Sequence, residues 1–311
     1  MYKLYSKIIA SIIVLSMLIY FFTGSRQGIW SKLGALNVVC TTSMIADATR
    51  AIGGDAVFVQ QLMGPGIDPH LYRASESDVY ALSSANLIFY NGLHLEGKMA
   101  EILHNMQSHT PAIAIADALS PEKLIESDFK GIYDPHVWHD ATLWIGAVMQ
   151  IRNGLIKYDP DHTKYYEERC AEYVYRMEQL DAYVRELVAT IPPEKRILVT
   201  AHDAFEYFGR AYGFKVVGLQ GINTDAQVST KDVQNVADFI VAHKIPAIFL
   251  ESSIPDRNIQ AVQKAVESRG GHVTIAPEIF SDALGNPDTT AGTYHGMIKH
   301  NIETITSALN K

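Results

Sequence analysis

Residues 161–190 contain neither glycine nor proline, and they are bounded by Asp159-Pro160 and Pro192-Pro193. Because those two residue types are the ones that interrupt helices, this stretch predicts one long helix. Apolar and aromatic side chains recur along it mostly at three- and four-residue steps, which predicts one buried stripe: Tyr166, Cys170, Tyr173, Met177, Leu180, Tyr183, Val184 and Leu187. At 1.5 Å per residue the helix is about 45 Å long, enough to run the length of a two-lobed protein.

On both sides of this helix, apolar strand-like runs alternate with helical segments. Such alternation predicts parallel βαβ units with right-handed crossovers. The chain of 311 residues is long for one domain, so we expect two. The predicted fold class is α/β, with two Rossmann-like lobes of parallel sheet flanked by helices and one rigid linking helix. The expected boundaries are 36–160 for the first lobe, 161–190 for the helix and 191–311 for the second lobe.

The predicted strands and helices have the following bounds. Before the linking helix we expect strands at 36–42, 56–62 and 87–90 and helices at 45–52 and 75–84. After it we expect strands at 197–200, 215–219 and 247–251 and helices at 204–212 and 230–242.

The first 25 residues have the pattern of a targeting segment. Lys3 and Lys7 precede residues 8–22, which carry no charge and are mainly apolar. This arrangement predicts a signal peptide, or an N-terminal membrane anchor if it is not cleaved, and therefore a periplasmic or extracytoplasmic protein. Lipidation of Cys40 is disfavoured because Val39 stands where a small residue is required. We expect both Cys40 and Cys170 to be buried thiols.

The charge and the motifs exclude several classes of function. The formal net charge is −8 and no basic stripe is present, so the sequence does not indicate a nucleic-acid partner. A mildly acidic surface suits cations instead. The sequence contains no His-Glu-x-x-His motif, no phosphate-binding glycine loop and no nucleophile elbow, so it has no common catalytic signature.

One tripeptide occurs twice, as Asp68-Pro69-His70 and Asp134-Pro135-His136. Each histidine is expected in a loop, with the aspartate capping the turn or holding one imidazole nitrogen. A third histidine, His202, follows the strand predicted at 197–200, and we expect Asp203 to cap the next helix and leave this imidazole free. Asp282 is the fourth member of the candidate set.

Three imidazoles and one carboxylate suit a divalent transition ion, with zinc favoured and manganese or ferrous iron acceptable. The four residues are so far apart in sequence that only the assembled fold can bring them together, in a cleft between the lobes. We expect one ion per chain and no organic cofactor. The remaining candidates are expected to lie at the surface or to support the site, with His139 the strongest of them: His94, His139, His295 and His300.

Several longer segments carry a family resemblance. They are residues 64–72, 90–96, 134–138, 200–205, 251–255 and 280–282. In these segments the chain resembles the metal-binding solute-binding proteins of bacterial ABC transporters, the TroA/ZnuA/PsaA family, and is most similar to its TroA members. The resemblance covers nearly all of the chain after the targeting segment. It implies metal held between two lobes by four ligands: His70, His136, His202 and Asp282.

The resemblance implies a monomeric, non-enzymatic carrier that delivers Zn²⁺ or Mn²⁺, or Fe²⁺, to an ABC permease driven by its ATPase. Manganese-selective relatives carry glutamate at the third ligand, where this chain has His202, and this favours zinc or a broader range. Zinc scavengers often carry a long histidine-rich loop, which residues 119–133 lack.

Two alternative functions remain from the sequence. A zinc-dependent hydrolase could use the same metal with Glu206 or Glu251 as its general base, although both residues also fit structural roles. A binding module for corrinoids or iron chelates would share the linking helix, but the clustered histidines argue against it.

Overall fold

The computed structural model describes residues 34–127 and 130–310. The predicted targeting segment, residues 1–25, lies outside the described residues. Within the described part of the chain, no helix is both long and apolar enough to cross a membrane.

The first lobe is built on a four-stranded parallel sheet. Its strand order is β2-β1-β3-β4, with β1 (Leu36–Cys40), β2 (Val57–Gln61), β3 (Leu87–Tyr90) and β4 (Ala112–Ala114). The helices of this lobe are α2 (Ser43–Gly53), α3 (Glu76–Ser84), α4 (Ala100–Met106) and α5 (Ala141–Tyr158). Helix α3 begins with a capping box, because Ser75 and Asp78 satisfy each other's backbone N–H groups. Cys40 is buried in β1 and Cys170 is buried in the linking helix, as predicted.

The second lobe repeats this arrangement. Parallel pairs form between β5 (Ile197–His202) and β6 (Lys215–Gln220) and between β7 (Ala247–Glu251) and β8 (Thr274–Ile279), and β5 lies against β7. The helices are α7 (Glu206–Tyr212), α8 (Thr230–His243), α9 (Arg257–Glu267) and α10 (Tyr294–Leu309). The two pairs are separate two-stranded sheets, and the contact between β5 and β7 places the strands in the spatial order β6-β5-β7-β8, which matches that of the first lobe.

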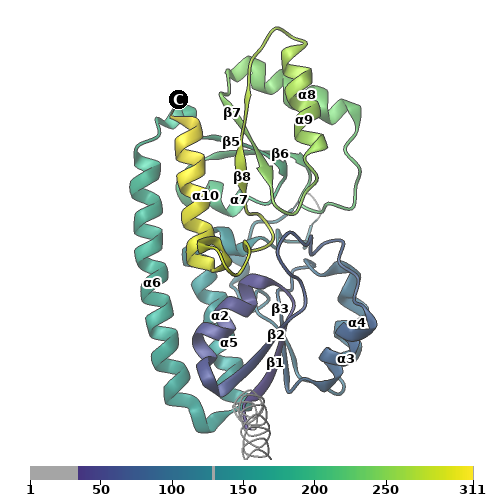
Figure 1. Ribbon diagram of the computed structural model, residues 1–311, viewed down its shortest axis with the longest axis vertical. Coiled ribbons are helices and arrows are strands. Elements are labelled where there is room, and N and C mark those ends of the chain that lie inside the picture. The colour runs from purple at the N-terminus through teal and green to yellow at the C-terminus, as the bar shows by residue number, and fades with distance from the viewer. Residues whose placement is uncertain (1–33, 128–129, 311) are drawn as a thin grey trace, which may run out of the picture.

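Helix α6 (Thr163–Ala189) links the two lobes and extends beside both of them (Figure 1). Its 27 residues give a length of about 40 Å. It packs against α2 and α5 of the first lobe and against α10, which follows β8. The predicted stripe is confirmed: Tyr166, Cys170, Met177, Leu180 and Val184 are buried, and Tyr173, Tyr183 and Leu187 pack against the same cluster. One hydrophobic cluster thus runs from the first lobe along α6 to α10.

Two local predictions around His202 were wrong. His202 is the last residue of β5, not a loop residue, because its backbone pairs in register with Gln220 and its N–H donates to Glu251 Oε1 at 2.9 Å. Helix α7 then begins at Glu206, not Ala204, and its N-cap residue is Phe205. Asp203 therefore does not cap this helix.

Candidate metal centre

The candidate residues converge between the lobes, where strand ends of the two sheets face each other. His70 follows β2, His136 directly precedes a 3₁₀ turn (Val137–His139), His202 ends β5 and Asp282 follows β8. One nitrogen from each imidazole and one oxygen of Asp282 all lie within 4.8 Å of one another. Each of the four residues is at most 2 % exposed. The fold therefore assembles, from both lobes, a buried set of atoms that can hold a metal ion.

The distances between these atoms match those of a small coordination sphere. Nε2 of His70 lies 3.1 Å from Nε2 of His136, which lies 3.4 Å from Asp282 Oδ1. Nε2 of His202 lies 3.2 Å from Asp282 Oδ2. Tetrahedral ligands at about 2.0–2.1 Å from a zinc ion are separated by about 3.3 Å. Both Asp282 oxygens face the site, so a higher coordination number is also available.

Two of the imidazoles are oriented by carboxylates. Asp134 Oδ1 lies 2.7 Å from Nδ1 of His136 and also accepts the His136 backbone N–H at 2.9 Å. Glu251 Oε2 lies 2.5 Å from Nδ1 of His202, and its other oxygen accepts the His202 backbone N–H. A carboxylate on Nδ1 places the proton there and leaves Nε2 as the ligand atom. The role of Asp134 was predicted from the sequence. Glu251 was considered there as a general base or a structural residue, and its contact with His202 was not predicted.

Asp68 holds its turn but also reaches across to the second lobe. Its Oδ1 accepts the His70 backbone N–H at 2.9 Å, which is the predicted turn contact. Its Oδ2 accepts a hydrogen bond of 2.6 Å from Thr224 Oγ1, which lies between β6 and α8. The loop that carries His70 is therefore bonded to the opposite lobe.

The segment that carries Asp282 is fixed by the first lobe. Trp138 Nε1 donates to the Ser281 carbonyl oxygen at 2.7 Å, and His139 Nε2 lies 3.0 Å from the same oxygen. Ser253 Oγ donates to Asp282 Oδ2 at 3.3 Å. Asp282 Oδ1 is buried with no hydrogen-bond partner in the described part of the chain. A buried carboxylate oxygen in that state is suited to bind a cation.

The other histidines that the sequence raised lie outside the four-residue cluster. His139 is buried beside Ser281 and supports the site, as predicted. His94 is exposed, and His300 bonds to the carbonyl of Glu278. The structure therefore gathers the four candidate ligands into one cluster and leaves these histidines outside it.

The residues of the site differ in the direction in which the fold shifts their pKa values. Burial lowers the pKa of His70 to about 3, so its imidazole is neutral. Burial also disfavours charge on His202, but the carboxylates of Glu251 and Asp282 outweigh it and raise its pKa well above the usual value. Burial opposes ionisation of Asp282, but His202, His136 and His70 together hold its pKa below the usual range. Without metal, a protonated His202 is therefore paired with an ionised Asp282.

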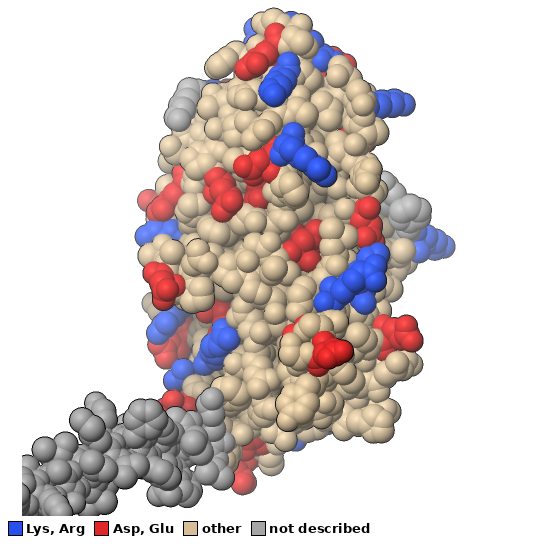
Figure 2. Space-filling model, turned by 45° about the vertical axis from the view of Figure 1, so that its right-hand side comes forward, with Lys and Arg blue, Asp and Glu red and all other residues tan. Residues whose placement is uncertain are grey.

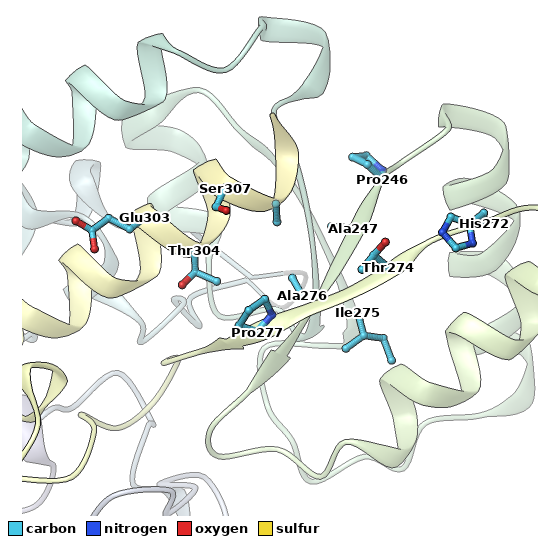
Figure 3. A pocket seen from close by; sticks show the side chains of 11 residues that line it. Pro246, Ala247, His272, Thr274, Ile275, Ala276, Pro277, Glu303, Thr304 and Ser307 are labelled. Carbon is cyan, nitrogen blue, oxygen red and sulfur yellow. The ribbon is translucent and has the colours of Figure 1, made fainter. Parts of the chain in front are cut away.

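A separate cavity in the second lobe contains none of the candidate ligands. A cavity of about 490 Å³ lies between β8 and α10, and none of its lining residues belongs to the four-residue cluster (Figure 3). On the face seen in Figure 2, lysine and arginine side chains are interspersed with aspartate and glutamate, with no continuous basic surface.

Comparison of the sequence with models of known protein families identifies the family of this chain. The model of the ZnuA family, described as zinc-uptake complex component A, periplasmic, matches residues 38–308. The chain belongs to this family.

Several known proteins match this chain over nearly their whole lengths. The zinc-binding protein TroA of Treponema pallidum is 44 % identical over 97 % of this chain and 98 % of its own. The manganese-binding lipoprotein MntA of Bacillus subtilis is 46 % identical, over 88 % and 90 %. The manganese ABC transporter substrate-binding lipoprotein PsaA of Streptococcus anginosus is 30 % identical, over 89 % and 90 %.

The solved structure of periplasmic TroA from Treponema pallidum superposes with a TM-score of 0.87 at 46 % identity. It covers 89 % of this chain and 99 % of that one. The predicted fold class and the family resemblance are therefore confirmed. The alternative of a zinc-dependent hydrolase is not supported, because the family is a metal-uptake family and Glu251 is engaged with His202.

Proposed function

We propose that the chain is the extracytoplasmic substrate-binding component of an ABC transporter. It captures one divalent transition ion between its lobes and delivers it to a membrane permease for import. The ligands are His70, His136, His202 and Asp282. The observation that carries this proposal is the convergence of their four buried ligand atoms within 4.8 Å.

A carrier suits this site better than an enzyme does. A catalytic zinc keeps a coordination position for water beside a general base. Here four protein residues surround the metal position, and the carboxylate of Glu251 is occupied by both His202 Nδ1 and the His202 backbone N–H. A corrinoid or iron chelate would need a wide groove, whereas the four ligand residues are almost completely buried.

The donor set admits both zinc and manganese. Three imidazole nitrogens suit zinc, and the two Asp282 oxygens supply the additional oxygen contact that manganese or ferrous iron prefers. Similar proteins carry zinc-binding and manganese-binding names, which agrees with a broad site.

The organisation of the carrier follows from the same proposal. Lobes at 36–160 and 191–311 hold the ion, and the helix at 161–190 limits how far they separate. The chain acts as a monomer with a permease and its ATPase, and residues 1–25 are the export signal or membrane anchor.

The direct test is elemental analysis of the purified protein after exposure to equal zinc and manganese. We expect about one tightly held ion per chain in the wild type and loss of that ion in His202→Ala. His300→Ala is the matched control, because this imidazole lies outside the cluster. A wild-type protein that holds no metal, or a His202→Ala variant that retains it, would refute the proposed site.

A further inference from the structure

The turn that follows β3 adopts an unusual backbone. Three successive residues have positive φ: Gly92 (+83°), Leu93 (+51°) and His94 (+65°). Glycine adopts this region freely, but Leu93 and His94 pay a steric cost there because of their Cβ atoms. Such a conformation persists only where surrounding contacts hold it in place.

Two carboxylates supply those contacts. Asp117 Oδ1 accepts the Leu93 N–H at 3.1 Å, and Glu96 holds the residues before it. Glu96 is 4 % exposed. Its Oε1 accepts the Asn91 backbone N–H at 2.7 Å and the Thr41 hydroxyl at 2.7 Å, and its Oε2 accepts the Gly92 N–H at 3.2 Å. Glu96 therefore ties the residue after β1 to the residue after β3 and folds the turn back on itself.

Asn91 connects this turn to the loop that carries His136. It is completely buried, and its Nδ2 donates to the carbonyl oxygens of Pro135 at 3.0 Å and Gly92 at 3.1 Å. The Pro135 carbonyl belongs to the peptide unit whose nitrogen is that of His136. Holding this oxygen fixes the peptide plane, and with it the His136 N–H that donates to Asp134.

We propose that Asn91 and Glu96 are positioning residues that hold the His136 loop in the geometry required for metal capture. This inference rests on the proposed function, because it takes His136 as a ligand. Neither residue belongs to the four-residue cluster, so both act through the Asp134-Pro135-His136 loop. Without the Asn91 contact, the Pro135 oxygen keeps, among the residues that the structure describes, only the Val137 N–H, at 2.8 Å, as a donor. The peptide plane is then held less firmly, which lets Nε2 of His136 shift from the other ligand atoms.

The test uses Co²⁺ as a spectroscopic probe bound to the purified protein. Asn91→Leu keeps a similar volume but removes the donor to Pro135. We expect its Co²⁺ dissociation constant to rise by about 10- to 100-fold, as is typical when a residue that supports a ligand is lost. The visible absorption bands of the bound Co²⁺ should shift as well, which a general loss of stability would not cause.

Asn37→Leu is the matched control. Asn37 lies near the start of β1, at the end away from Thr41, and its Nδ2 donates to the Ser84 carbonyl at 3.1 Å. The control variant therefore loses a similar hydrogen bond far from the site. We expect its Co²⁺ affinity and spectrum to equal those of the wild type. Equal weakening in both variants would overturn the inference, as would wild-type binding and spectrum in Asn91→Leu.

Thr41→Val removes the hydroxyl that donates a hydrogen bond to Glu96, with almost no change in the shape of the side chain. This variant tests the positioning role if Asn91→Leu does not fold. We expect a smaller shift in the same direction, and wild-type binding with an unchanged spectrum would then overturn the inference. Wild-type protein and His136→Ala are measured in parallel. If the wild type binds no metal, or His136→Ala binds it equally well, the proposed function fails, and this result is distinct from failure of the positioning role alone.

Discussion

At the scale of single residues, three identical imidazoles are placed in different electrostatic environments. His70 has no carboxylate on its Nδ1 comparable to those on the other two, and burial lowers its pKa to about 3. His202 lies between Glu251 and Asp282, whose negative charges overcome burial and raise its pKa. At pH 7 the metal therefore meets two kinds of histidine, one that is already neutral and one that must lose a proton.

We predict that metal binding at pH 7 releases about one proton, which comes from His202. The raised pKa means that His202 is protonated before binding, whereas the ligand form is neutral. Affinity should therefore rise with pH, by at most about tenfold per unit, until the pH passes the pKa of His202. Calorimetry in buffers of different ionisation enthalpy counts the proton. Binding that is independent of pH between 6 and 8 would contradict this assignment.

We predict that Glu251→Gln weakens metal binding by about 10- to 100-fold. The amide has nearly the same shape but no negative charge, so it holds the Nδ1 proton of His202 less strongly. It should also reduce the proton release, because the pKa of His202 falls. Competition with a chelator measures the affinity. Glu206→Gln, a half-buried glutamate on α7, is the control and should bind like the wild type.

At the scale of elements, the loop between β6 and α8 connects the lobes beside the site. Two successive residues of this loop contact separate segments of the first lobe. Thr224 donates to Asp68 at 2.6 Å, and Asp225 pairs with Lys98 at 2.9 Å. In the hydrogen bond Thr224 is buried and Asp68 is partly buried, whereas both side chains of the ion pair are more exposed and the pair contributes little. Thr224 is therefore the stronger of the two links.

We predict that Thr224→Val accelerates metal release by about three- to tenfold. A hydrogen bond of this kind contributes about 1 kcal/mol, and its loss frees the His70 loop from the second lobe. Stopped-flow transfer of metal to a chelator measures the rate. Thr230→Val, the same change at an exposed threonine on α8, should leave the rate unchanged. Equal rates for wild type and Thr224→Val would exclude this link.

Helix α6 provides a second prediction at this scale. Leu180 is 1 % exposed within the stripe that faces the shared hydrophobic cluster. We predict that Leu180→Ala lowers the free energy of unfolding by about 2–5 kcal/mol, through lost burial and the cavity left behind. Chemical denaturation measures the change. Gln179→Ala, at the exposed neighbouring position, should alter stability by less than about 0.5 kcal/mol.

At the scale of the whole molecule, the candidate ligands come in equal numbers from the two lobes. His70 and His136 belong to the first, and His202 and Asp282 to the second. A metal bound by all four therefore links the lobes, and it binds only when they are folded and in contact. The fold and its ligand are thermodynamically coupled for this reason.

We predict that saturating zinc stabilises the protein strongly. Free metal at about a thousand times its dissociation constant contributes about 4 kcal/mol to the free energy of unfolding. Differential scanning calorimetry with and without metal should show a higher midpoint for the wild type. The midpoint of His202→Ala should barely move, and an equal rise in this variant would place the stabilising metal elsewhere.

Several elements, and the residue types of the candidate site, could be read directly from the sequence. Apolar periodicity and the absence of glycine and proline at 161–190 predicted helix α6, and alternating runs predicted the parallel sheets. These signals are local, so they can be read along the chain. The repeated Asp-Pro-His tripeptide likewise indicated His70 and His136, because each histidine is adjacent to its own turn residue.

The contacts that support the candidate site became visible only in the folded structure. The carboxylate on His202 comes from Glu251, 49 residues away, and the partner of Asp68 is Thr224, 156 residues away. Chain order does not encode such contacts. The first arises only when β5 and β7 pack side by side within the second lobe, and the second only when the two lobes pack together. The raised pKa of His202 has the same origin, because it requires burial together with two carboxylates from other strands and loops. Residue types could be read from the sequence, but their distances and charges depend on the packed fold.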